Sequence, residues 1–189
     1  MCGIAGVVGV AERDRGIRMR AMRERIVHRG PDSAGEYVDG YSALGVRRLR
    51  VIDLVTGDQP QCDEAGRIWT IFNGEIYNFA ELRDQLAAEG HAFKTRSDTE
   101  VIVHLYERDG EAFVERLDGM FALAVWDAAA RTLVLARDRL GKKPLLYLAD
   151  GDELLFASEH AALLAGLDRR PAVDPIAIGL YLRDRKSVV

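Results

Sequence analysis

The chain has little cysteine: two residues among 189, Cys2 and Cys62, and only five prolines. Two cysteines are too few for the disulfide framework of a small secreted protein, and their spacing matches no metal-ligand pattern. No apolar run reaches the length of a membrane span, and no basic segment precedes the first apolar run as in a secretory signal. We therefore expect free thiols, no membrane association and a cytoplasmic location.

An excess of charge of one sign is also absent. The 26 Lys and Arg residues are interspersed with 30 Asp and Glu residues, which gives a formal net charge of −4. Nucleic-acid binding requires a basic patch, so we expect no nucleic-acid partner and favour a small polar metabolite. The four histidines, His28, His91, His104 and His160, form no metal-like grouping along the sequence, so we expect no metal site.

What is present is the composition of an ordinary globular domain, with 48% hydrophobic and 30% charged residues. Short apolar runs predict strands at residues 3–9, 41–48 and 68–72, and residues 119–157 predict four more strands in an antiparallel meander. Amphipathic helices are expected up to about Val27 and in the stretches after residues 78 and 97. The mixture predicts antiparallel sheet covered by helices, in one domain with a tail.

Capping residues suggest where two of the helices begin. Asn78 suits an N-cap, so the preceding Asn73–Gly74 pair is expected to be a turn. Ser97 and Glu100 have the spacing of a capping box, which places Asp98 in the first helical turn. There the helix dipole would favour the ionised carboxylate.

The opening stretch MCGIAGVVG combines a thiol with glycines at every third position. Removal of Met1, expected before a small side chain, leaves Cys2 with both a thiol and a free α-amine. With pKa values of about 8.5 and about 7.7–8.0, the amine can accept the thiol proton without any histidine. The alternative is that Cys2 is a small residue at the start of a buried strand. The glycines indicate a close approach by other backbone or by a ligand.

Six later stretches follow Cys2-Gly3-Ile4 in a recognisable order: HRGPDSAG, RRLRVIDLVTGDQP, FNGEIYN, RSDTEVI, DGMFALAVWD and RDRLGKKPLLY. Together these motifs resemble the glutaminase domain of glutamine-dependent asparagine synthetases, a class II glutamine amidotransferase and an N-terminal nucleophile hydrolase. The resemblance runs from Cys2 to about Glu159. It implies an α+β fold, namely a four-layer αββα sandwich of antiparallel sheets.

The resemblance also implies the reaction, which is hydrolysis of L-glutamine to glutamate and ammonia through a cysteinyl thioester. Cys2 would be the nucleophile, and the Asn73 side chain and Gly74 backbone N–H would stabilise the oxyanion. Arg48 would hold the α-carboxylate of glutamine and Asp98 its α-ammonium group. By motif position the substrate-binding residues are Arg48, Leu49, Val51, Ile52, Asn73, Gly74, Glu75 and Asp98.

The same resemblance sets the expected domain organisation. Residues 1–165 would form the type 2 glutamine amidotransferase domain, and residues 166–189 a linker or the start of a missing synthetase domain. The pyrophosphate loop SGG-x-DS of that synthetase domain does not occur in this sequence. We expect no cofactor in this chain, with ATP and Mg confined to the missing domain. The expected partners are L-glutamine and the C-terminal synthetase domain of the parent protein, and a homodimer is left open.

Two other functions stay open at this point. One is the glutaminase domain of another class II amidotransferase, which makes glucosamine 6-phosphate, phosphoribosylamine or glutamate, although NGEIYN and RLRVIDL favour the synthetase type. The other is a noncatalytic fragment that binds only glutamine or a partner. HRGPDSAG is expected to support the pocket, and RDRLGKKP to be a scaffold loop or a face toward the missing domain.

Overall fold

The computed structural model describes residues 1–9, 14–169 and 171–184, and within them two antiparallel sheets. The five-stranded sheet has the order β2-β3-β1-β9-β8 and the four-stranded sheet the order β4-β5-β6-β7. The strands are β1 (Gly3–Gly9), β2 (Ser33–Val38), β3 (Ser42–Arg48), β4 (Gln61–Cys62), β5 (Ile68–Ile76), β6 (Gly119–Asp127), β7 (Thr132–Arg137), β8 (Leu146–Asp150) and β9 (Glu153–Ala157). The helices are α1 (Arg15–Glu24), α2 (Phe79–Ala88), α3 (Glu100–Asp109), α4 (His160–Ala165) and α5 (Pro175–Asp184), with 3-10 turns η1 (Val27–Arg29) and η2 (Gly110–Arg116).

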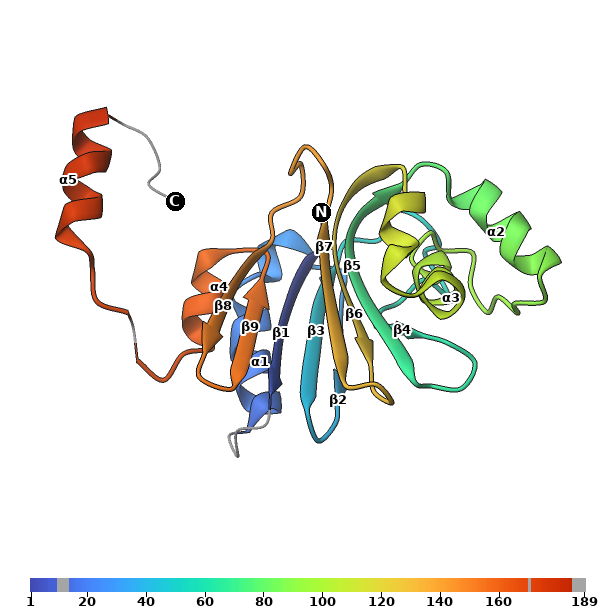
Figure 1. Ribbon diagram of the computed structural model, residues 1–189, viewed down its shortest axis with the longest axis horizontal. Helices are drawn as coiled ribbons and strands as arrows, with labels where there is room; N and C mark the ends of the chain where they lie inside the picture. Colours follow the sequence, from blue (N-terminus) through green and yellow to red (C-terminus); the bar gives the residue numbers. More distant parts are fainter. Residues whose placement is uncertain (10–13, 170, 185–189) are drawn as a thin grey trace.

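Three buried apolar clusters hold four layers together. Met22 of α1 belongs to a cluster that packs α1 and α4 on one sheet, and Leu105 of α3 to a cluster that packs α2 and α3 on the other. Ile4, Ile71 and Phe156 belong to the cluster between the sheets. Figure 1 shows both sheets between α1 and α4 on one side and α2 and α3 on the other. The predicted αββα sandwich is confirmed.

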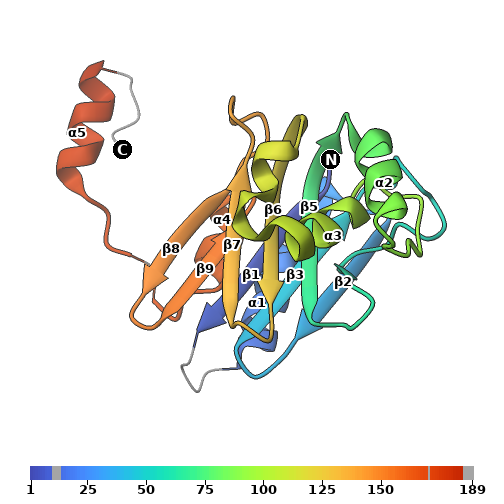
Figure 2. The ribbon, with the colours of Figure 1, turned by 45° about the vertical axis from the view of Figure 1, so that its right-hand side comes forward.

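Strand β1 explains how the N-terminus is placed. It pairs with β3 on one side and β9 on the other, at the centre of the five-stranded sheet. Ile4 packs toward the second sheet, whereas Ala5 and Val7 pack toward α1 and α4. This alternation is that of a strand buried on both faces. Cys2 therefore stands at the starting end of a central strand, and the N-terminus lies beside β5 in both views (Figures 1 and 2).

The predicted turn at Asn73–Gly74 is wrong, because both residues lie inside β5. They pair with Ala122 and Phe121 of β6. A Cβ atom on Gly74 would stand 2.2 Å from the Met120 carbonyl oxygen, so glycine is required here by the closeness of the neighbouring strand. Strand pairing has overridden the local preference of Asn-Gly for turns.

The predicted meander over residues 119–157 is divided between the two sheets. Strands β6 and β7 belong to the four-stranded sheet, and β8 and β9 belong to the five-stranded one. The segment RDRLGKKP therefore crosses from one sheet to the other. The edge strand β2 was not predicted, because SAGEYV has no strong apolar alternation.

The first helix is shorter than predicted, because α1 ends at Glu24. Ile17 is 62% exposed, whereas Met19, Met22 and the following Ile26 are buried. The face toward the sheet is thus set by the methionines and Ile26.

Beyond α4 the chain leaves the sandwich. In both views α5 lies apart from the two sheets (Figures 1 and 2), and residues 170 and 185–189 of the expected tail lie outside the described part of the chain. The boundary between residues 165 and 166 stays a prediction. No described helix is both long enough and apolar enough to cross a bilayer.

Gly6 in β1 makes room for a packed side chain. Gly6 pairs with Phe156 of β9, and a Cβ atom on Gly6 would lie 2.4 Å from the Phe156 ring and 3.1 Å from the Ala43 carbonyl oxygen. The aromatic ring, which is fully buried between the sheets, occupies the place of a side chain at Gly6. The backbone approach predicted from the sequence occurs at Gly9, where a Cβ atom would lie 2.4 Å from the Asp152 carbonyl oxygen, whereas at Gly6 an aromatic side chain approaches.

We predict that Gly6→Ala lowers the free energy of unfolding by about 1–3 kcal/mol, because the added methyl group displaces a packed ring. Urea denaturation measures this change. Gly40→Ala is the matched control, since a Cβ atom there meets nothing within 4 Å. Adding Phe156→Leu to Gly6→Ala should restore part of the loss. A Gly6→Ala protein as stable as the unsubstituted chain would contradict this packing.

Candidate active site

One pocket opens where β1 begins, and it gathers residues from both sheets. Its lining comprises Met1, Cys2, Arg48, Leu49, Val51, Ile52, Gly57, Gln59, Phe72, Asn73, Gly74, Glu75, Ser97, Asp98, Thr99, Met120 and Lys143. Every residue that the sequence motifs proposed for catalysis or substrate binding belongs to this set. The fold therefore brings all of them together, although their individual roles stay predictions.

The thiol of Cys2 faces the pocket with a single weak hydrogen bond. Its Sγ donates to the Leu49 carbonyl oxygen at 3.7 Å. The backbone of Cys2 is held from the other side, where Arg29 Nε donates to the Cys2 carbonyl oxygen at 3.0 Å. Arg29 also forms an ion pair of 2.9 Å with Glu159. HRGPDSAG thus anchors the main chain of Cys2 through Arg29.

The side-chain amide of Asn73 is the unusual group in the pocket. Asn73 is 1% exposed, yet neither its Nδ2 nor its Oδ1 has a hydrogen-bond partner in the structure. Buried amides are nearly always paired, so an unpaired one facing a pocket is poised for a ligand. An N–H donor in this position suits an oxygen that acquires negative charge.

Arg48 is also buried in the lining, and the loop that follows it wraps around its guanidinium group. Nη1 donates to Asp58 at 2.7 Å, and Nη2 donates to the carbonyl oxygens of Ile52 at 3.0 Å and Asp53 at 2.7 Å. These three bonds use three of its five N–H donors. Two donors remain for a ligand, so Arg48 both shapes the loop and can still bind a carboxylate.

Asp98 lies before α3 and not in its first turn, so the predicted capping box is wrong. The N-cap is Thr99, and the Glu100 carboxylate instead accepts from the Lys94 and Thr95 amides, each at 2.7 Å. Asp98 Oδ2 accepts from the Ile76 amide at 3.1 Å. Burial raises the pKa of Asp98 to about 6, against the Ile76 hydrogen bond. Desolvation therefore outweighs the hydrogen bonds to the carboxylate, and the structure disfavours the ionised form that the sequence predicted.

Lys143 is a pocket residue that the sequence motifs did not identify. It is 5% exposed, and its Nζ donates to the Met1 Sδ at 2.7 Å. The preceding turn is fixed by Asp138, whose carboxylate accepts from the amides of Leu140, Lys142 and Lys143 and from Phe121 of β6. No local signal reveals this lysine, because its position depends on RDRLGKKP crossing between the sheets. The segment is more than a scaffold loop.

Gln59 was also missed. Its Oε1 accepts from the Phe72 amide at 2.7 Å and its Nε2 donates to the Thr99 hydroxyl at 3.2 Å. These bonds join the loop after Arg48, strand β5 and the start of α3 around the pocket. Gln59 lies in the segment RRLRVIDLVTGDQP, which is the only sequence signal that points to it.

The fold and this pocket define a class of protein. Two antiparallel sheets packed face to face between helices, with a second-position cysteine opening into a pocket beside an unpaired amide, are the architecture of an N-terminal nucleophile hydrolase. The family model described as "Glutamine amidotransferase domain" matches residues 1–188, and the chain belongs to that family.

Curated relatives agree with the asparagine synthetase resemblance. Glutamine-hydrolysing asparagine synthetase 2 of Bacillus subtilis (strain 168) is 44% identical over 169 residues, which are 87% of this chain and 22% of the relative. Asparagine synthetase 3 of Arabidopsis thaliana is 42% identical over 167 residues, which are 86% of this chain and 28% of the relative. The chain thus spans between a fifth and a third of the length of these relatives.

Solved structures share the fold. A glutamine phosphoribosylpyrophosphate amidotransferase from B. subtilis, complexed with ADP and GMP, gives a TM-score of 0.71 over 87% of this chain and 43% of that chain. A structure of the allosteric regulatory enzyme of purine biosynthesis gives 0.72 over the same shares. Both are 24% identical to this chain, so this likeness concerns the fold alone.

We predict that Asp98→Asn stabilises the protein above pH 6. The folded pKa of about 6 exceeds the ordinary value of 3.8, so ionising Asp98 costs folding free energy, about 3 kcal/mol once fully charged. Asparagine keeps an oxygen that can accept from the Ile76 amide. Urea denaturation should show the gain at pH 8, and it should shrink from pH 6 toward pH 4.

Asp84→Asn, which removes one exposed carboxylate from α2, is the control for the change in net charge. An Asp98→Asn protein that is no more stable than the unsubstituted chain at pH 8 would show that burial of this carboxylate carries no such cost.

Proposed function

We propose that this domain hydrolyses L-glutamine to glutamate and ammonia through a thioester on Cys2. The observation that carries the proposal is the unpaired, buried amide of Asn73 in the same pocket as the Cys2 thiol. Membership of the glutamine amidotransferase family supports the choice of substrate. The reaction needs no group other than those of the chain and a water molecule.

Acylation begins once Met1 has been removed and the α-amine of Cys2 is free. The amine accepts the thiol proton, and the sulfur attacks the side-chain amide carbon of glutamine. The Asn73 Nδ2–H and the Gly74 backbone N–H stabilise the resulting oxyanion. The α-ammonium of Cys2 then returns the proton to the leaving nitrogen, which departs as ammonia.

Deacylation reverses the proton transfers with water as the nucleophile. The α-amine accepts a proton from water, whose oxygen attacks the thioester carbon. Collapse of the second tetrahedral intermediate breaks the C–S bond, releases glutamate and returns the proton to the sulfur. The thiol and α-amine belong to Cys2, directly before β1, and the two oxyanion donors belong to Asn73 and Gly74 in β5. The reaction would therefore need no movement of one sheet relative to the other.

The two charged ends of glutamine account for Asp98 and Arg48. The ammonium group of a bound substrate would favour the ionised Asp98 carboxylate and so lower the pKa that burial raises. The two unused N–H donors of Arg48 suit the α-carboxylate. Leu49, Val51 and Ile52 line the same pocket and can exclude water from the aliphatic stem of glutamine.

We assign the released ammonia to asparagine synthesis. The relatives at 42–45% identity are glutamine-hydrolysing asparagine synthetases, and this chain corresponds to less than a third of each. The ATP- and Mg-dependent activation of the acceptor carboxylate would belong to the remaining length of such a protein. We also place the activity in the cytoplasm, which suits two free thiols, while a homodimer stays a prediction.

Asn73→Ala tests the oxyanion assignment. We expect kcat for glutamine hydrolysis to fall about 100- to 1,000-fold with a smaller change in KM, because the lost donor acts on charge that develops in the transition state. Glutamate release measures both constants. The control is Asn78→Ala, at the chain's other asparagine, which lies outside the pocket. An unchanged kcat in Asn73→Ala would refute the assignment.

We further propose that Lys143 tunes the base. Lys143 lines the same pocket as Cys2, and its Nζ contacts the sulfur of Met1, the residue whose removal would expose the α-amine of Cys2. A neighbouring positive charge lowers the pKa of an amine. Lys143 would thus keep more of the amine in its free-base form near neutral pH.

Lys143→Met should therefore move the acidic limb of the kcat/KM pH profile about one unit higher, because the amine then binds its proton more tightly. Lys142→Met removes a charge from the exposed neighbouring position and serves as the control. A profile that Lys143→Met leaves in place, with Met1 shown by intact mass to be removed, would rule out this role.

A further inference from the structure

A second cluster of polar side chains lies away from the pocket, where three segments meet beside the four-stranded sheet. Glu64 follows β4, His91 follows α2, and His104 and Glu107 are one turn apart on α3. One ligand atom from each of these four residues lies within 4.8 Å of the others. Residues three apart on a helix share a face, which explains how His104 and Glu107 point to the same side.

His104 is the most deeply buried member of this cluster, at 1% exposure, and its ring nitrogens lack hydrogen bonds. The nearest carboxylate oxygens are those of Glu64, 3.7 Å from Nδ1, and Glu100, 3.8 Å from Nε2. Both distances exceed a hydrogen bond. Buried polar groups are nearly always paired, so the unpaired Nδ1 of His104, which faces Glu64, is available to bind a cation.

The other members are held in matching positions. The Glu64 carboxylate accepts from the Ala92 amide at 3.0 Å, which fixes it beside His91. The Nδ1 of His91 lies 3.6 Å from Glu107 Oε2, and the rings of His91 and His104 are 5.0 Å apart between centroids. Two imidazole nitrogens and two carboxylates thus converge from three segments.

We propose that Glu64, His91, His104 and Glu107 bind a zinc ion. Two nitrogen and two oxygen donors suit zinc in four-coordinate geometry, with bonds of about 2.0–2.2 Å. Such bonds place neighbouring ligand atoms about 3.5 Å apart, so the cluster must contract slightly around the ion. Glu64 and Glu107 are 40% and 32% exposed and can make this movement.

Glu100 is not one of the four proposed ligands, but its carboxylate lies behind one of them, His104. It faces the Nε2 of His104 across the ring from Glu64, and it is 2% exposed. A carboxylate behind a ligating histidine orients the ring and increases its basicity. One opposing charge is present, because Arg67 Nη2 lies 3.8 Å from Glu107 Oε1. Arg67 is 59% exposed and can turn into solvent.

The ion would be structural, because four protein ligands close its coordination shell. It would tie α3 to the loops after β4 and after α2. Helix α3 follows directly on Asp98 and Thr99 of the pocket lining. The same ion would therefore fix the position of the helix whose start borders the active site.

Metal binding tests the proposal without any measurement of activity. The full chain carrying Cys2→Ala, which removes the reactive thiol, is freed of metal with chelator and titrated with zinc chloride by calorimetry. We expect one zinc ion per chain, at least tenfold weaker binding in His91→Asn and in Glu107→Gln, and a zinc-dependent rise in Tm that both variants lose. Since His104 is buried, these two more accessible positions carry the test.

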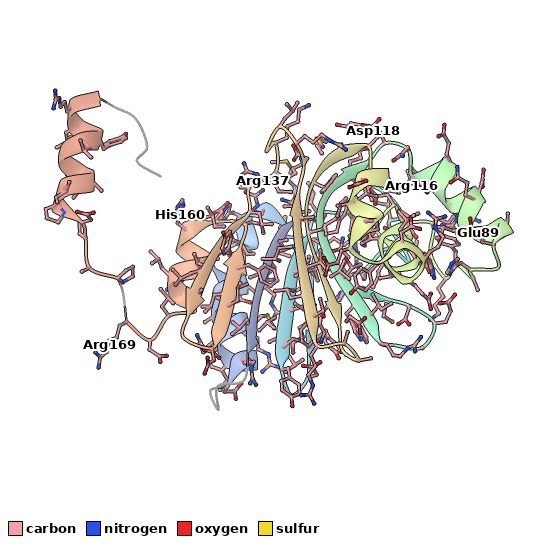
Figure 3. All side chains as sticks on the ribbon, in the orientation of Figure 1. Glu89, Arg116, Asp118, Arg137, His160 and Arg169 are labelled. Carbon is pink, nitrogen blue, oxygen red and sulfur yellow. The ribbon has the colours of Figure 1, made fainter. Side chains whose placement is uncertain are left out.

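His160→Asn is the matched control, because His160 lies on α4 at the other side of the sheets (Figure 3) and is exposed. Cobalt chloride supplies an independent reading, since four-coordinate cobalt absorbs strongly in the visible range. Absence of zinc binding, or equal binding in His91→Asn, would overturn the proposal. A thiolate-to-cobalt absorption band that disappears with Cys62→Ala would place the ion at Cys62 and overturn it as well.

Discussion

The pocket depends on an amide that the fold buries without a partner. Leaving one polar group unpaired costs about 1–3 kcal/mol, and Asn73 has both of its amide atoms in this state. The ionised Asp98 adds a second desolvation cost in the same lining. Only a scaffold with a large apolar core can carry such costs, and here the cluster between the sheets contributes that core. The unpaired Asn73 amide therefore lowers the stability of the fold, and for the same reason it remains available to bind a ligand.

The position of Cys2 raises a different difficulty, because the first residues of a chain are usually poorly ordered. The first strand of this protein lies at the centre of a sheet, between β3 and β9. Hydrogen bonds to both neighbours hold the strand that begins directly after Cys2. Arg29 holds the Cys2 carbonyl oxygen as well. Gly6 allows Phe156 to pack onto this strand, which ties the position of the terminus to the packing between the sheets. Order at Cys2 thus comes from long-range contacts, while Cys2 still lines the pocket.

Much of this arrangement could be predicted from the sequence, and the failures share a physical cause. The strands β1, β3 and β6 were predicted because their apolar runs are strong, and the motif order led to the family, the αββα fold and a set of residues that meet in one pocket. The turn at Asn73–Gly74 failed because pairing with β6 outweighs a local preference. The partition of β6 to β9 between two sheets, the approach of Lys143 and the raised pKa of Asp98 all depend on what packs nearby, which no local pattern contains. The same holds for His91 and His104, whose separation in sequence resembles no metal motif.

Helix α3 connects the two polar sites. From Glu100 to Tyr106 every residue of the helix is buried, so the helix can shift only as a unit against the sheet beneath it. Its beginning is joined to the pocket through Gln59 and Thr99, while the face carrying His104 and Glu107 looks toward the cluster with His91. A cation bound by the cluster would draw that face toward the loops after β4 and α2. Because the helix is short and packed along its length, the same restraint would reach Asp98, which lines the pocket together with Cys2.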